Sequence, residues 1–190
     1  MVSSSAPRRR ADAERSRAAI LEAATRLLAD RPGAGLAAIA AEAGVTRQTV
    51  YAHFASRDEL LAAVMDIVTE RTVAAMNAAD PDSGPAADAL VRMLEISWRA
   101  FESHPVLHRV EATPQGDRDR HIPVDDYLRR LIRRGQRAGE FDRTQPPSWL
   151  AAAVIALGHA AGEEVKAGRM SVEEAEERLR VSVLRLVGTD

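Results

Sequence analysis

Side chains able to donate hydrogen bonds to phosphates and base edges are concentrated in one stretch of the chain, residues 44–60, which reads GVTRQTVYAHFASRDEL. Arginine, threonine, tyrosine and histidine can donate to phosphate oxygens, and glutamine can pair with both N6 and N7 of adenine. The chain has only two Trp, two Tyr and three Phe residues, yet a tyrosine, a histidine and a phenylalanine stand at positions 51, 53 and 54. This combination suits the recognition of a polyanion.

An α-helix over residues 47–54 would divide these side chains between a buried and an outward face. At about 100° per residue, Val50 and Phe54 lie on one side of such a helix, and Gln48 and Ala52 lie on the opposite side. The tyrosine and the histidine flank this outer ridge. The major groove of DNA is about 12 Å wide and admits one helix, and a small alanine allows close approach. The pattern therefore favours a recognition helix over a core hairpin with half-buried Tyr and His rings.

Local signals around this helix predict the elements that position it. Gly44 permits a sharp turn, and Thr46 stands where it can cap the N-terminus of the helix. Ser56 and Glu59 form a capping box that opens a long helix over about residues 57–78. A short helix, a tight turn and a second short helix in this order are typical of a helix-turn-helix unit.

Two further helices are predicted before the turn. Ile20, Ala24 and Leu28 have the spacing of one helical face, and this first helix should end before Pro32. A shorter helix is expected over about residues 37–43, where Gly44 ends it. The three helices together would form a small domain with its own apolar core.

The N-terminal segment carries an excess of positive charge. Residues 1–57 hold nine Arg against five Asp or Glu, a net of +4, whereas the rest of the chain has a net charge of −6. We expect residues 1–11 to form a basic arm that is disordered without DNA, in which Arg8, Arg9 and Arg10 could enter a neighbouring minor groove. A solvated tail without a partner is the alternative.

Two segments, ILEAATRLLAD and IAAEAGVTRQTVYAHFASRDELL, closely resemble the N-terminal signature of TetR-family transcriptional regulators over about residues 16–62. The resemblance implies a DNA-binding domain over residues 12–56 and a helical ligand-binding and dimerisation domain over residues 57–190. It also implies a homodimer on an inverted-repeat, palindromic operator in double-stranded DNA. A repressor that a small-molecule effector releases is the function that this family suggests.

The same resemblance implies which side chains contact DNA. Some would bind phosphates, some would lie nearest the bases, and one would lie near the backbone at the start of the helix over residues 57–78. The candidate DNA-contacting residues are Thr46, Tyr51 and His53 at phosphates, Arg47, Gln48 and Thr49 at bases, and Arg57 at the backbone.

Two positions depart from the pattern of the family. The family often has Ser or Thr at the start of its second helix, whereas Gly35 and Leu36 stand there in this chain. We therefore expect this helix to meet the DNA backbone with amides only, or to have Gly35 as a weak cap. Gln48 stands where relatives commonly have a small residue, and a bidentate pair with adenine gives about 1–3 kcal/mol of discrimination.

The rest of the chain is predicted to be helical too, which makes the fold class all-α with about nine helices. No alternating apolar pattern typical of strands appears. After the helix-turn-helix, helices are expected over about residues 57–78, 86–103, 105–112, 124–138, 148–168 and 172–186, with an exposed loop over residues 113–123.

An effector pocket, if the protein has one, should lie between helices of the C-terminal domain. Aromatic residues are scarce and aliphatic residues common, which favours an apolar or amphipathic effector. The alternative for each aromatic side chain is an ordinary place in the core. The candidate pocket residues are Met93, Trp98, Phe101, His108, Tyr127, Leu131, Trp149 and His159.

The last two predicted helices are the candidates for a dimer surface. The helix within residues 148–168 has small residues that allow a second helix to approach closely, and the final helix has an apolar stripe. Two such helices from each subunit would form a four-helix bundle, and an ordinary intrachain core is the alternative. The candidate interface residues are Ala152, Ala156, Ala160, Leu179, Val183 and Leu186.

Several classes of function find no support in the sequence. The chain has no cysteine, and it has no phosphate-binding glycine loop or paired His–carboxylate motif that would suggest an enzyme. His104 and His108 are four residues apart, but Pro105 separates them, and we expect neither a metal nor a cofactor. No segment approaches the roughly 20 apolar residues of a membrane span, so a cytoplasmic protein is the default. A helical ligand-binding protein with a purely structural helix-turn-helix is one alternative, and a regulator that activates or needs no ligand is another.

Overall fold

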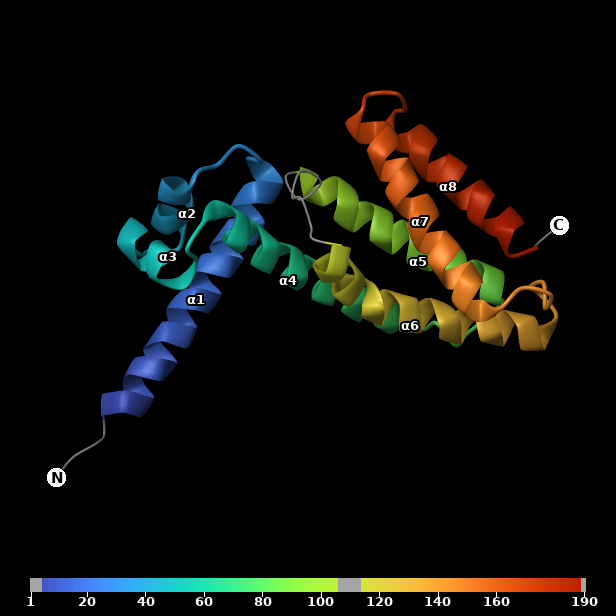
Figure 1. Cartoon of the computed structure of the whole chain (residues 1–190), viewed down its shortest axis with the longest axis horizontal. Coiled ribbons are helices and arrows are strands. Elements are labelled where there is room, and N and C mark those ends of the chain that lie inside the picture. Colours follow the sequence, from blue (N-terminus) through green and yellow to red (C-terminus); the bar gives the residue numbers. More distant parts are fainter. Residues whose placement is uncertain (1–4, 106–113, 189–190) are drawn as a thin grey trace. The chain divides into compact units, whose positions relative to one another are not determined.

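The computed structural model describes the backbone of residues 5–105 and 114–188, and the side chains of residues 9–105 and 122–188. These residues form an all-α fold of eight helices without a strand, close to the nine helices predicted (Figure 1). None of the described helices is long and apolar enough to cross a bilayer. The helices are α1 (Ser5–Asp30), α2 (Leu36–Glu42), α3 (Arg47–His53), α4 (Arg57–Ala78), α5 (Ala86–Ser103), α6 (Pro114–Ala138), α7 (Pro147–Lys166) and α8 (Val172–Leu186).

The chain divides into two compact units, and the division falls inside α4. The N-terminal unit contains the described residues up to Val68, together with His104 and Pro105. The C-terminal unit contains the remaining described residues, from Thr69 onward. The predicted domain boundary lay between residues 56 and 57, about three turns earlier, where α4 begins. The first half of α4 therefore packs as part of the N-terminal unit.

The N-terminal unit is a three-helix domain completed by the start of α4. α1 packs against both α2 and α3, and α2 packs against α3. One buried cluster joins these helices. It contains Ile20 and Leu28 of α1, Val50 of α3, Phe54 at the end of α3, and Leu60 of α4. Fully burying such a side chain contributes roughly 1.5–3 kcal/mol. Because helices as short as α2 and α3 are not stable alone in water, this cluster is what holds them in place.

The predicted disordered arm over residues 1–11 is wrong for residues 5–11, since α1 already begins at Ser5, and residues 1–4 lie outside the described residues. The segment reads SAPRRRADAERSR, and arginine and alanine are strong helix formers. Pro7 lies in the first turn, where its missing N–H removes no helical hydrogen bond. The basic residues at the N-terminus are therefore presented on a helix.

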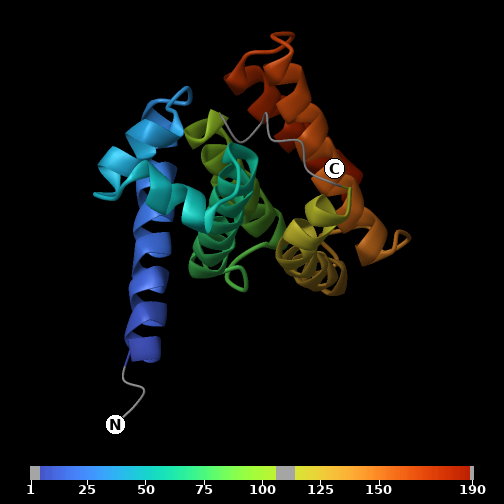
Figure 2. The same ribbon diagram turned by 60° about the vertical axis from the view of Figure 1, so that its left-hand side comes forward.

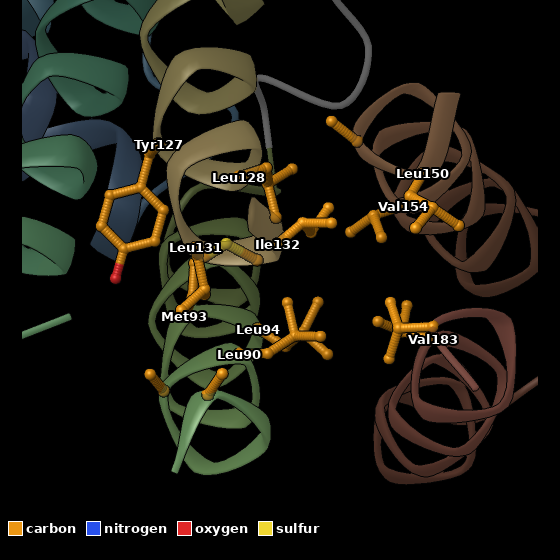
Figure 3. Close-up of a cluster of buried hydrophobic side chains, with 14 of the residues drawn as sticks. Leu90, Met93, Leu94, Tyr127, Leu128, Leu131, Ile132, Leu150, Val154 and Val183 are labelled. Carbon is orange, nitrogen blue, oxygen red and sulfur yellow. The ribbon is translucent and has the colours of Figure 1, made fainter. Parts of the chain in front are cut away.

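The C-terminal unit is a bundle of α5 to α8 around a second apolar core. α6 packs against α5 and α7, and α8 packs against α5 and α7. In Figure 3, Leu90 of α5 and Ile132 of α6 point toward Leu150 of α7 and Val183 of α8. All four side chains are fully buried. One apolar stripe from each of the four helices thus meets in the same core.

The predicted loop over residues 113–123 is wrong, because α6 begins at Pro114 and runs to Ala138. Proline is favourable in the first turn of a helix, where Pro114 lies. Pro123 stands inside α6 and removes one backbone hydrogen bond, which the helix tolerates at this position. The separate short helix predicted over residues 105–112 lies outside the described residues, apart from Pro105.

Candidate nucleic-acid interface and effector core

A glycine turn and a threonine cap place α3 in the N-terminal unit. Gly44 has φ +67°, a left-handed conformation that suits glycine, and the amide of Val45 donates to the carbonyl of Ala40 at 2.9 Å. Thr46 is the N-cap of α3, and its Oγ1 accepts a hydrogen bond from the amide of Thr49 at 3.0 Å. The predicted turn and cap are confirmed, so the first turn of α3 is fixed by local bonds.

The buried side of α3 is the side that the helical wheel predicted. Val50 and Phe54 are 0% and 1% exposed, whereas Tyr51 is 44% exposed. Gln48 and Ala52 are also exposed. The ridge that carries Gln48 and Ala52 is therefore open to solvent in this chain.

Arg47 and Tyr51 pair along one edge of the exposed ridge. A guanidinium N–H of Arg47 donates to the Tyr51 hydroxyl at 3.1 Å, and the guanidinium carbon lies 5.4 Å from the centroid of the Tyr51 ring. The pair holds a cation and a phenol side by side, one turn apart, on the solvent side of α3. His53 is half-buried near the end of α3, and its ring lies 6.5 Å from the ring of Phe54.

The hydroxyls of Thr46 and Thr49 lie 2.8 Å apart, within hydrogen-bonding distance. Only one of the two hydroxyl protons is used between them, so the other is left to donate outward. Thr46 is exposed and Thr49 is half-buried. An oxygen acceptor that approaches the start of α3 therefore meets a free hydroxyl proton and the guanidinium of Arg47.

Arg57 lies in the first turn of α4 and is half-buried rather than free at the surface. Its guanidinium donates to the backbone carbonyl of Ala34, in the loop before α2, at 2.5 Å. Ser56 caps α4 by accepting from the amide of Glu59 at 3.1 Å. The carboxylate of Glu59 accepts from the amide of Ala55 at 2.6 Å, one residue before the amide that a capping box would use. Arg57 thus braces the α1–α2 loop with at least one of its five N–H groups.

The start of α2 agrees with the departure seen in the sequence. Gly35 is its N-cap, with an extended backbone and no side-chain cap bond. The amides of Ala38 and Ile39 both donate to the carbonyl of Gly35, at 3.0 and 3.2 Å. No side chain of Gly35 or Leu36 can offer a hydroxyl here, so a phosphate at this end of α2 would meet backbone amides only.

Sequence reasoning missed Arg17, which the structure places beside the end of α3. The guanidinium carbon of Arg17 lies 5.2 Å from the centroid of the Phe54 ring. The signal in the sequence is the heptad spacing of Arg10, Arg17 and Ala24, which continues the core-facing stripe of α1 toward its N-terminus. A second residue on α1, Arg26, lies 3.6 Å from Glu42 of α2 and ties these two helices together.

Five of the predicted pocket residues lie together in the core of the C-terminal unit. Met93, Trp98, Tyr127 and Leu131 are buried in one cluster, and Phe101 packs against it. The Trp98 and Phe101 rings stack with centroids 5.0 Å apart.

Polar groups at this aromatic cluster differ in how they are satisfied. The Tyr127 hydroxyl donates to the carbonyl of Met76 at 3.4 Å, and burial raises the pKa of Tyr127 above its usual value, against the lowering effect of Arg92 and Arg130. The indole Nε1 of Trp98 is buried and has no hydrogen-bond partner in the part of the chain that the structure describes. A buried N–H group without an acceptor is costly, typically about 1–3 kcal/mol. It would gain from an acceptor supplied by a ligand.

Other predicted pocket residues do not join this core. Trp149 is 61% exposed, and His159 is exposed on the same helix. The reason is the register of α7: Leu150, Ala151 and Val154 point into the core, which turns the neighbouring positions outward. His108 lies outside the described residues, so the structure does not describe the pair of His104 and His108 that was considered as a metal site. No group of three His, Cys, Asp or Glu side chains that could bind a metal occurs among the described residues.

The predicted dimer residues divide between the surface and the core. Ala152, Ala156 and Ala160 of α7 are exposed, as an interface in a free protomer requires. Leu179 and Val183 of α8 are 6% and 0% exposed and belong to the core of their own chain, so their assignment to the dimer surface was wrong.

The physical reason is the four-residue spacing of Ala175, Leu179, Val183 and Val187, which forms one buried stripe on α8. Leu186, the last predicted interface residue, is partly buried and packs against the same core. The half-buried apolar residues that α8 leaves on its other sides are Val181 and Leu184.

Comparisons with known proteins connect this geometry with a family. The family model described as bacterial regulatory proteins, tetR family, matches residues 20–64. The chain is similar to the HTH-type transcriptional repressor LfrR of Mycolicibacterium smegmatis, with 36% identity over 157 residues and 82% of each chain covered.

Solved structures show the same likeness. The structure of LfrR from Mycobacterium smegmatis in complex with proflavine has a TM-score of 0.63 and 31% identity, and covers 93% of this chain and 99% of that chain. A putative transcriptional regulator from Saccharomonospora viridis in complex with choline has a TM-score of 0.69 and 25% identity, and covers 88% of this chain and 94% of that chain. At these coverages both matches extend over most of the chain.

Proposed function

The chain belongs to the TetR family of bacterial transcriptional regulators and is a DNA-binding regulator. From this premise we propose that it is a repressor, which binds an inverted-repeat operator as a homodimer and leaves the operator when it binds a small molecule. The observation that carries the proposal is the outward ridge of α3, where Gln48 and Ala52 are exposed while Val50 and Phe54 are buried. Regulators of this family are generally not enzymes, and a regulator of bacterial DNA acts in the cytoplasm. The similar protein LfrR is described as a repressor.

The chemistry of α3 supports an assignment of its side chains to the two parts of DNA. Thr46, Tyr51 and His53 stand at the edges of the ridge, where groove walls present phosphates, and each can donate one hydrogen bond. Arg47 and Gln48 lie on the leading turn, where they can reach base edges. The contact between Arg47 and Tyr51 holds both donors in a fixed geometry before DNA binds, which lowers the entropy cost of binding.

Thr49 and Arg57 contribute more indirectly in this proposal. Thr49 is half-buried, and its hydroxyl lies against that of Thr46, so it orients the cap before it meets a base. Arg57 donates to Ala34 and so fixes the loop that leads into α2. Its remaining N–H groups are the ones available to a phosphate.

The outward face of α7 supports the proposed homodimer. Trp149, Ala152, Ala156 and Ala160 recur at helical spacing along this face and are all exposed. Trp149 is 61% exposed, so covering it would bury about three fifths of the roughly 150–250 Å² of a tryptophan, worth about 2–4 kcal/mol at about 25 cal/mol per Å². The alanines let a second helix approach closely. The partner proposed for this face is the same face of a second copy, with Val181 of α8 at its side.

The aromatic end of the C-terminal core is the proposed effector site. The Trp98 and Phe101 rings stack on each other at this end of the core, and the buried Trp98 N–H is a hydrogen-bond donor without an acceptor among the described residues. These features suit an apolar or amphipathic molecule that has an aromatic face and one acceptor atom. The structures of similar regulators in complex with proflavine and with choline support a small organic effector.

α4 is the element that can couple an effector to DNA. Near its start, Arg57 bonds to Ala34 within the N-terminal unit, and near its end the carbonyl of Met76 accepts from Tyr127 within the C-terminal unit. Recognition helices about 34–36 Å apart match successive major grooves. A ligand that shifts α4 changes this spacing, with a coupling free energy of typically 1–3 kcal/mol.

The proposal is tested by selecting genomic fragments that bind the purified protein, then measuring transcription from a reporter placed behind the selected operator. We expect a palindromic consensus, binding with two protomers, and lower reporter expression when the protein is present. Proflavine is the first probe for release, because a similar protein binds it. Failure to enrich any sequence at physiological salt, with a folded protein, would falsify the proposed function.

A further inference from the structure

The N-terminal half of α1 extends beyond the domain that its other half completes. α1 has 26 residues, which corresponds to a length of about 39 Å at about 1.5 Å per residue. Ile20 is the first buried residue along it, and residues 9–19 are all exposed or half-buried. Figures 1 and 2 both show this half of α1 continuing past α2 and α3. About three helical turns, residues 9–19, therefore have exposed or half-buried side chains.

This extension is basic on a defined face. Arg10 and Arg17 are seven residues apart, so they lie within about 20° of each other around the helix and about 10.5 Å apart along it. The same face continues into Ala24, which is buried in the core. Arg15 is two residues from Arg17, about 200° around the helix, and forms an ion pair with Asp12. One side of α1 thus carries Arg10 and Arg17 with Glu14 between them, a net charge of +1, and the other side carries an arginine that is already paired.

Arg17 shows where the basic face lies relative to α3. Its guanidinium stands 5.2 Å from the ring of Phe54, the residue that ends α3 and follows His53. Arg10 is exposed two turns farther along the same face. The two arginines therefore extend the polar surface of α3 outward from its C-terminal end, within the same three-helix domain.

We propose that Arg10 and Arg17 form a second DNA-contacting surface, which binds phosphates flanking the half-site that α3 reads. The inference rests on the proposed function, since it requires α3 to enter the major groove. Two features favour DNA as the occupant: the net positive charge of the face is complementary to phosphate, and Arg17 lies beside Phe54, the C-cap of α3. The 10.5 Å spacing corresponds to the rise of about three base pairs at about 3.4 Å per step, so the footprint should lengthen by about that amount on each outer side.

This surface differs from the flexible arm expected from the sequence. A disordered arm loses conformational entropy when it binds, whereas side chains on a preformed helix lose only rotamer freedom. A helix is also too wide for a minor groove of about 6 Å, so Arg10 and Arg17 should contact the phosphate backbone rather than base edges. The proposed contacts therefore add affinity and salt dependence without adding base preference.

The test compares Arg10→Ala with the matched control Arg15→Ala in the full-length protein on its selected operator. Binding is followed by fluorescence anisotropy between 50 and 200 mM salt. Each lost phosphate contact lowers the slope of log K against log salt by about 0.9, so a dimer that loses two contacts should change by about 1.8. The affinity advantage of the wild type over Arg10→Ala should therefore shrink about twelvefold across this salt range. Arg15→Ala should keep the wild-type slope.

A second arm of the experiment uses operators trimmed at their outer ends. On an operator that lacks the flanking base pairs, wild type and Arg10→Ala should bind equally, because the phosphates that Arg10 contacts are missing. On the full operator, the Arg10→Ala, Arg17→Ala double variant should lose more binding affinity than Arg10→Ala alone. An unchanged melting temperature for Arg10→Ala is the check that this variant is folded.

Two results would overturn the proposal. One is a wild-type salt slope for Arg10→Ala, and the other is an equal loss for Arg15→Ala, which would indicate a general effect of charge. Either result leaves operator binding by the wild type intact, whereas a wild type that binds no operator would instead contradict the proposed function.

Discussion

Replacing Gln48 by alanine tests the orientation of α3 at a single side chain. Gln48 lies on the exposed ridge of α3, opposite the buried Val50. Alanine is the better helix former by a few tenths of a kcal/mol, so the substitution should leave the melting temperature almost unchanged. Any change in DNA binding would then come from the interface and not from loss of fold.

The expected effect on binding is a loss of base preference. A bidentate pair between glutamine and adenine is worth about 1–3 kcal/mol of discrimination, which is about a 5- to 150-fold preference at one base pair in each half-site. Alanine cannot make either hydrogen bond, so the four bases at that position should bind with nearly equal affinity. The other positions of the half-site should keep their preferences, because the remaining side chains of α3 are unchanged.

The assay is selection from an operator library randomised across both half-sites, sequenced after one round for each protein. Gln145→Ala serves as the matched control, since Gln145 is exposed and lies in the C-terminal unit. A Gln48→Ala profile identical to the wild-type profile would refute a base contact for Gln48. A uniform loss on all sequences would mean that Gln48 contacts the backbone alone.

Three further predictions concern the cap, the dimer face and the C-terminal core. Thr46→Ala removes the acceptor for the amide of Thr49, and we expect a loss of about 0.5–2 kcal/mol in unfolding free energy, measured by urea denaturation. Ala156→Glu places a charge on the exposed face of α7, and we expect sedimentation to show monomers that remain folded. Because burial raises the pKa of Tyr127, this tyrosine loses its proton at a lower pH in the unfolded chain than in the folded chain. The free energy of unfolding should therefore be unaffected below pH 10.0, the ordinary pKa, and should fall as the pH rises from there through the pKa of the folded state. Tyr127→Phe should remove this decline at high pH, as followed by thermal melting between pH 8 and 11.

Each of these predictions has a matched control. Thr46→Ser keeps a hydroxyl and should keep most of the stability. Ala74→Glu changes an exposed alanine on α4 and should leave the dimer intact. For the tyrosine, the control is the wild type melted in the same series of buffers. Dimers that survive Ala156→Glu, or a decline at high pH that persists in Tyr127→Phe, would contradict the corresponding assignment.

Caps and helix faces of the N-terminal unit were predictable because their bonds are local. Thr46 accepts from the amide of Thr49, three residues on, and Ser56 accepts from the amide of Glu59 in the same way. Such bonds depend on four consecutive residues, all visible in the sequence. The buried pair Val50 and Phe54 follows from one helical turn in the same way.

Whether an apolar helix face packs within its own chain or against a second subunit was not predictable, because the spacing of its residues is the same in both cases. Leu179 and Val183 have the spacing of an interface as well as of a core, and only the packing of α8 on α5 and α7 decides between the two. Trp149 shows the opposite case. An aromatic side chain was expected to be covered within the chain, but the register set by Leu150 turns it outward. Both errors concern which face of a helix meets its own chain.

The start of α6 shows a second limit. Proline and glycine between residues 113 and 123 predict a loop, and the local pattern contains no apolar stripe to oppose that prediction. α6 nevertheless starts at Pro114, because a proline is acceptable in the first turn and one interior proline, Pro123, removes only one hydrogen bond. Proline and glycine thus destabilise a helix, and whether the helix still forms depends on the rest of its residues.

The functional surfaces of this chain consist of the residues on each helix that are not buried in the core. Once Val50 is known to be buried, the outward residues of α3 are polar donors, and only a partner rich in acceptors can satisfy them together. Once Leu150 and Val154 are known to be buried, the outward face of α7 that carries Trp149 also carries three exposed alanines, which suit another helix and offer no side-chain donor to a polyanion. The same fold therefore presents two surfaces of opposite chemistry. The chemistry of each surface, and not the fold alone, separates DNA from a second subunit as the partner.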